Sequence, residues 1–72
     1  MKNGGFFAQM QEIEGSIREA GYDPYLQLSG FILTQDERYI TRRNDTRRRV
    51  VELDRHLLDE YVRRMKPGNR HP

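Results

Sequence analysis

The chain has 72 residues, with 13 basic and 11 acidic side chains, no cysteine, no tryptophan and a hydrophobic fraction of 35%. A chain this short forms one domain at most, and its small apolar core favours association with a second subunit. The absence of cysteine excludes disulfides, thiolate metal sites and thiol chemistry. No apolar run reaches the roughly 20 residues of a membrane span, and no signal-peptide pattern is present, so we expect a soluble cytoplasmic protein.

The charges are distributed unevenly along the chain. Residues 1–37 carry two basic and six acidic side chains, whereas residues 38–72 carry eleven basic and five acidic ones. A chain with this asymmetry can attract an acidic partner with its second half, or pair with a copy of itself. Eleven of the 13 cations are arginine, whose planar guanidinium binds carboxylates and phosphates through two parallel hydrogen bonds.

Two helices are predicted in the first half of the chain. Apolar residues spaced three and four apart indicate a helix over residues 6–20, and Gly21 stops it because glycine adopts a left-handed cap without strain. Asp23 then caps a second helix, with Pro24 at its first position, where the missing N–H does no harm. The most hydrophobic stretch of the chain, residues 25–33, belongs to this second helix.

The end of this hydrophobic stretch has an alternative interpretation. A strand over residues 31–34 competes with the helix, since a short apolar run does not define its own period. Gly30 is expected to let another element approach closely. Thr34 and Glu37, three residues apart, match a capping box that opens a short turn through Tyr39.

The last helical stretch is predicted over residues 45–65, capped by Thr41, Asn44 or Asp45. Asp54 could also cap a fresh start and divide the stretch into two helices. Its apolar residues form two neighbouring stripes, which are Val50, Leu53, Leu57 and Tyr61, and Val51, Leu58, Val62 and Met65. This face is wider than a single surface helix needs, so it supplies both core and dimer contacts. We assign Leu53, Leu57, Tyr61 and Val62 to the dimer interface or the core.

These elements predict an all-α fold of four to five helices, arranged as helix-loop-helix pairs in one domain over residues 6–66. Residues 1–5 and 67–72 are expected to be flexible ends. The domain is expected to form a homodimer.

The densest feature of the sequence is residues 42–49, which hold five arginines. Cations in a first helical turn oppose the helix dipole, so this cluster is unfavourable for the fold and favours a role in binding anions or acidic proteins. Nucleic acid is the alternative partner, but a net charge of only +2 argues against it.

No arrangement of residues predicts catalysis. The two histidines, His56 and His71, have no partners at the spacing of a metal site, and no phosphate-binding glycine loop or Ser–His pair is present. We therefore expect no enzyme activity, no metal and no cofactor.

A series of short motifs in a fixed order resembles the IreB/ReoM family of small cytoplasmic regulatory phosphoproteins of Gram-positive bacteria. The matching residues are Gly21-Tyr22-Asp23-Pro24, Gln27, Gly30 to Thr34, Asp36, Tyr39 to Arg42, Asp45, Arg47, Leu53 to His56 and Leu58 to Met65. The resemblance covers about 45 residues, from Gly21 to Met65, without a gap.

This resemblance implies a helical homodimer without enzyme activity that regulates peptidoglycan precursor synthesis under a PASTA-type Ser/Thr kinase. The implied protein partners are a cell-wall precursor enzyme and a Clp-type protease component. By the same resemblance, Arg42, Asp45, Arg47 and Arg55 are the candidate partner-binding residues. The family carries its phosphorylated threonine in an N-terminal arm, whereas residues 1–15 contain no Ser or Thr.

Overall fold

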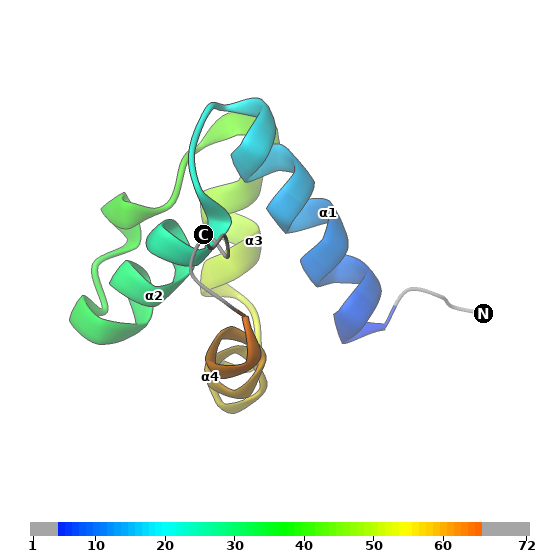
Figure 1. Ribbon diagram of the computed structural model, residues 1–72, viewed down its shortest axis with the longest axis vertical. Helices are drawn as coiled ribbons and strands as arrows, with labels where there is room; N and C mark the ends of the chain where they lie inside the picture. The colour runs from blue at the N-terminus through cyan, green and yellow to red at the C-terminus, as the bar shows by residue number, and fades with distance from the viewer. Residues whose placement is uncertain (1–4, 66–72) are drawn as a thin grey trace, which may run out of the picture.

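Four α-helices and two short 3-10 helices make up residues 5–65, the part of the chain that the computed structural model describes (Figure 1). Their bounds are Phe6–Glu19 (α1), Pro24–Thr34 (α2), Glu37–Tyr39 (η1), Arg43–Asp45 (η2), Thr46–Val51 (α3) and Arg55–Arg64 (α4). The described residues contain no strand, so the all-α prediction is confirmed and the alternative strand over residues 31–34 is wrong. The predicted flexible ends lie, except for Gly5, outside these residues.

The junction between α1 and α2 forms as the sequence predicts. Gly21 follows the end of α1 with a φ of +92°, in the left-handed region that glycine tolerates. The carboxylate of Asp23 then accepts a hydrogen bond of 2.8 Å from the backbone N–H of Tyr25, and Pro24 occupies the first position of α2. Local residue chemistry therefore determines this turn.

The capping box at Thr34 is a wrong prediction. Thr34 is the last residue of α2, and its hydroxyl donates a hydrogen bond of 2.8 Å to the carbonyl oxygen of Gly30. Asp36 caps η1 instead, accepting a hydrogen bond of 2.9 Å from the backbone N–H of Arg38. The turn through Tyr39 that the box was expected to open does form, with an aspartate at its start.

Gly30 allows the close approach that the sequence suggests. A Cβ built on Gly30 would lie 2.5 Å from the Cδ1 atom of Tyr39, a distance that no real Cβ contact tolerates. The ring of Tyr39 in η1 therefore rests directly on the backbone of α2.

The last helical stretch is divided, as the alternative at Asp54 predicted, and one continuous helix over residues 45–65 is wrong. Asp54 accepts hydrogen bonds from the backbone N–H groups of His56 and Leu57 and so starts α4. Among the three proposed caps of α3, Asp45 stands directly before the helix but makes no side-chain cap, since its φ of +63° turns the backbone left-handed. Thr41 accepts from the backbone N–H of Arg43 and precedes η2.

The core gathers apolar side chains from every α-helix. Its buried members are Met10, Ile13, Ile17, Leu28, Phe31, Ile40, Val50, Leu58 and Val62. Helix α4 packs against α2 and is seen nearly end-on in Figure 1, so it crosses the longer helices steeply. Of its apolar residues, Leu58 and Val62 enter the core, whereas Leu57 stays 43% exposed. In the described part of the chain, no helix has the length and apolar character needed to cross a membrane.

Candidate functional site

Three of the four predicted partner-binding residues lie together around one hollow beside α3. Arg42, Asp45 and Arg47 line this hollow, which has a volume of about 310 Å³. Its other lining residues are Glu37, Arg48, Val51 and Glu52. We call it the α3 hollow. The residues come from η1, η2, α3 and the segment between them, so the fold gathers charges that are spread over sixteen positions of the sequence.

Arg47 is held in place by the backbone. Its Nε–H donates a hydrogen bond of 2.9 Å to the carbonyl oxygen of Ile40, which ties α3 to the segment before η2. The remaining N–H groups of Arg47 have no hydrogen-bond acceptor among residues 5–65. Arg47 thus supports the fold with its Nε–H, and its other N–H groups keep their donor capacity in this part of the chain.

Asp45 is already paired within the chain. Its carboxylate accepts hydrogen bonds from the Nε and an Nη of Arg48. The hydrogen bond from Arg48 lowers the pKa of Asp45, with a smaller electrostatic contribution from Arg49. Asp45 is therefore ionised at neutral pH and orients Arg48 at the edge of the α3 hollow.

Two of the five clustered arginines are paired with acidic residues of another helix, and Arg48 is paired with Asp45 and Glu52 beside it. Arg43 pairs with Glu19 at 3.5 Å, and Arg49 pairs with Glu12 at 3.2 Å, so both arginines tie the cluster to α1. Arg42, by contrast, forms no ion pair with any described residue. The anion-binding surface that the sequence suggests is thus reduced chiefly to Arg42 and the N–H groups of Arg47 that do not bond to Ile40. Two guanidinium groups form a small surface for the phosphate backbone of a nucleic acid.

Arg55 does not line the α3 hollow. Its guanidinium lies 4.7 Å from the centre of the Phe31 ring and donates a hydrogen bond to the side chain of Gln35. The next residue, Asp36, has a lowered pKa, mainly because Arg38 donates hydrogen bonds to it and weakly because Arg47 lies near. Arg55 is therefore held at the end of α2, by Phe31 and Gln35.

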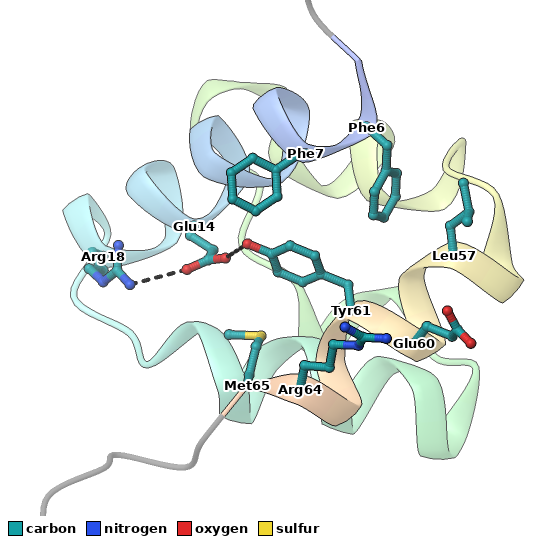
Figure 2. A pocket seen from close by; sticks show the side chains of 9 residues that line it. All are labelled: Phe6, Phe7, Glu14, Arg18, Leu57, Glu60, Tyr61, Arg64 and Met65. Atoms are coloured by element: carbon teal, nitrogen blue, oxygen red, sulfur yellow. Dashed lines mark hydrogen bonds and ion pairs between the residues drawn. The ribbon is translucent and has the colours of Figure 1, made fainter.

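A second, apolar groove lies between α1 and α4. It has a volume of about 670 Å³ and is lined by Phe6, Phe7, Glu14, Arg18, Leu57, Glu60, Tyr61, Arg64 and Met65. Figure 2 shows the rings of Phe6 and Phe7 facing the ring of Tyr61, with charged side chains around them. Leu57 and Tyr61, two of the four residues assigned to the dimer interface or the core, thus line this groove, which we call the α1–α4 groove.

The other two residues that we assigned to the dimer interface or the core, Leu53 and Val62, do not line this groove. Leu53 lines a separate hollow of about 460 Å³ beside the α1–α4 groove, and Val62 is buried in the core. The groove also contains Phe7, which is 64% exposed. The sequence does indicate that Phe7 is exposed, because this residue falls outside the apolar stripe of α1 that begins with Phe6 and Met10.

Tyr61 spans the α1–α4 groove and joins its two walls. Its hydroxyl donates a hydrogen bond to the carboxylate of Glu14, which also pairs with Arg18 at 3.2 Å (Figure 2). Burial, followed by the bond to Glu14, raises the pKa of Tyr61 to about 12 from an ordinary 10.0. The phenol is therefore held in its neutral, donating form at neutral pH.

The raised pKa of Tyr61 predicts a loss of stability in alkali. The unfolded chain releases the phenol proton from about pH 10, whereas the folded chain holds it until about pH 12. The stabilisation is therefore complete below pH 10 and disappears between pH 10 and pH 12. We expect Tyr61→Phe to flatten this part of the curve of unfolding free energy against pH, as measured by urea denaturation. An equally steep fall in both proteins would contradict the assignment.

The described residues contain no group of three His, Asp or Glu side chains that could hold a metal ion. In comparisons with known proteins, one family matches the sequence, described as IreB regulatory phosphoprotein, over residues 2–65. No solved structure matches the chain.

Proposed function

Because the chain belongs to the IreB family of regulatory phosphoproteins, we propose that it is a non-enzymatic regulatory adaptor that acts by binding another protein. The observation that carries the proposal is the family match over residues 2–65, which includes all four residues of the charged motif, Arg42, Asp45, Arg47 and Arg55. The adaptor acts in the cytoplasm and needs no cofactor.

The binding surface is the α3 hollow, extended past the end of α2 to Arg55. Arg42 is exposed there without an ion pair in the described chain, and Arg47 is fixed by its bond to Ile40, so two guanidinium groups are available. A guanidinium binds a carboxylate with two parallel, charge-assisted hydrogen bonds. The partner is therefore an acidic protein surface.

The resemblance to the IreB/ReoM proteins supports a more specific proposal about the pathway. The partner is an enzyme of peptidoglycan precursor synthesis or a Clp-type protease component, and the adaptor is controlled by a PASTA-type Ser/Thr kinase. The chain acts as a homodimer whose subunits meet at the α1–α4 groove. An exposed apolar groove with charges of both signs on its rim suits a second copy of the same chain.

The binding proposal is tested by a nuclease-treated pull-down from a lysate of the source cell, with bound proteins identified by mass spectrometry. Arg42→Gln removes one charge-assisted contact, worth about 1.5–3 kcal/mol. We expect it to weaken partner binding roughly ten- to a hundredfold. Arg63→Gln is the matched control, because it makes the same charge change on α4 and disturbs only an exposed pair with Asp59.

The same experiment separates the proposed function from the nucleic-acid alternative. Recovery of a cell-wall precursor enzyme or a Clp component with wild type and Arg63→Gln, but not with Arg42→Gln, supports the adaptor. Equal recovery with all three proteins would show that the surface is wrong. Ribosomal or nucleoid proteins that are recovered in a parallel sample without nuclease and are lost after nuclease treatment would assign the arginines to phosphates.

A further inference from the structure

Helix α2 carries no charged residue on any of its sides. Residues 24–35 contain no Asp, Glu, Lys or Arg, although 33% of the chain is charged. A helix that is hydrophobic all round is normally buried all round. Here α2 is buried on one side, where Leu28 and Phe31 enter the core, and its other side has no cover among residues 5–65.

Two leucines stand on this uncovered side. Leu26 is 63% exposed and Leu33 is 83% exposed. They are seven residues apart, which is about two helical turns, so they lie on the same side of α2. The small side chain of Ser29 lies between them, and the exposed ring of Tyr39, which rests on Gly30, widens the apolar surface. We call Leu26, Ser29, Leu33 and Tyr39 the α2 face.

The α2 face is separate from the two surfaces described above but adjoins one of them. None of its residues lines the α1–α4 groove or the α3 hollow. The short helix η1 packs against both α2 and α3. Within η1, Tyr39 belongs to the α2 face and Glu37 lines the α3 hollow. The α2 face and the α3 hollow therefore lie on either side of one short turn.

The α3 hollow alone is a poor binding surface for a protein. Its volume is only about 310 Å³, and its lining is charged except for Val51. A specific protein interface buries about 800 Å² on each partner and has an apolar centre, depleted of charge, inside a polar rim. The α3 hollow supplies guanidinium groups for such a rim, and the α2 face supplies the uncharged centre.

We propose that the α2 face is the apolar centre of the partner-binding surface and receives an amphipathic helix of the protein partner. This helix places apolar side chains on Leu26 and Leu33 and directs acidic side chains to Arg42 and Arg47. The recess that the small Ser29 leaves between the two leucines accepts a side chain of the facing helix. The inference rests on the proposed function, because it assumes that the partner binds Arg42 and Arg47.

The docking is tested with a synthetic amphipathic helix that has leucines on one side and glutamates beside them, titrated into the full chain and followed by NMR. We expect Leu26→Gln and Leu33→Gln each to raise the Kd roughly ten- to a hundredfold, because each removes a leucine that the peptide buries. Both side chains are exposed, so circular dichroism should show an unchanged fold. A peptide with lysines in place of the glutamates should bind more weakly, since Arg42 and Arg47 repel it.

Leu57→Gln is the matched control, because it makes the same change at an exposed leucine of the α1–α4 groove. We expect this control to bind the peptide as wild type does, and the peptide to shift the NMR signals of α2 and η1. If binding were lost with Leu57→Gln and kept with Leu33→Gln, the helix would bind in the α1–α4 groove and the inference would be wrong. A wild type that does not bind the peptide would also overturn it.

The variant Arg42→Gln separates this inference from the proposed function. If Arg42→Gln weakens peptide binding and the two leucine variants do not, the α2 face is excluded and the proposed surface stands. If the leucine variants weaken binding while Arg42→Gln and the lysine peptide do not, the α2 face stands as a helix-binding surface. In that case the acidic contact at Arg42, and with it the surface named in the proposed function, is wrong.

Discussion

Replacing Leu58 by alanine is expected to unfold most of the protein at room temperature. Leu58 is fully buried, and α4 packs against α2, so this side chain is a main anchor of the last helix. A buried leucine reduced to alanine costs about 2–5 kcal/mol, because the lost contacts leave a cavity that closes only in part. A domain of this size has roughly 3–5 kcal/mol of stability in total, so the loss is comparable to the whole.

Urea denaturation followed by circular dichroism measures this effect. Leu33→Ala is the matched control, since it makes the same change on α2 at a side chain that is 83% exposed. We expect this control to stay within about 0.5 kcal/mol of wild type. If Leu58→Ala lost less than about 1 kcal/mol, its side chain would not be the anchor that the buried position indicates.

The helix boundaries that local chemistry determines were predictable from sequence. Gly21 ends α1, Asp23 and Pro24 start α2, and Asp54 starts α4, each through a bond or a backbone angle within three residues of the boundary. Thr34 shows the limit of this reasoning. The threonine and Asp36 compete for the same turn, and the motif alone does not tell which side chain caps it.

The direction in which α4 faces was not predictable from its apolar pattern. Leu57 and Leu58 are adjacent apolar residues, and the sequence pattern alone does not show which of them is buried. Because the helix breaks at Asp54, α4 begins with a new rotational phase relative to α3, and Leu58 rather than Leu57 faces the core. The predicted stripe of Val50, Leu53, Leu57 and Tyr61 assumed a continuous helix. Once the helix is divided, only Val50 of this stripe is fully buried.

The sequence alone leads to an overestimate of how many arginines in residues 42–49 are available to bind an anion. Glu12 and Glu19 lie more than 20 positions before the arginines that they pair with, so only the packing of α1 against η2 and α3 brings them together. Arg42, Asp45 and Arg47 come together around one hollow for the opposite reason. These residues lie within six positions of the sequence, so the segment before η2, η2 itself and the first turn of α3 present them to the α3 hollow.

Replacing Leu57 by aspartate is expected to dissociate the proposed homodimer and leave the subunit folded. Leu57 is 43% exposed and lines the α1–α4 groove beside Tyr61, so the change removes no buried contact from the core. In a two-fold dimer the same patch serves both subunits, and each substitution therefore acts twice. On dimerisation, each substituted subunit loses roughly 1 kcal/mol of the free energy gained by burying apolar surface. The new carboxylate must also give up its hydration at the interface, which opposes association further. The dissociation constant should then rise by about a hundredfold or more.

Light scattering at micromolar concentration distinguishes the two states. Wild type should have twice the chain mass of 8.6 kDa, and Leu57→Asp should have the mass of one chain with an unchanged circular dichroism spectrum. Leu33→Asp is the control, because it places the same charge on an exposed position of α2 away from the α1–α4 groove. A monomeric wild type would contradict the homodimer itself, whereas a dimeric Leu57→Asp would move the interface to another face. The α3 hollow does not include Leu57, so a folded monomer that still binds the partner would show that the two surfaces act independently.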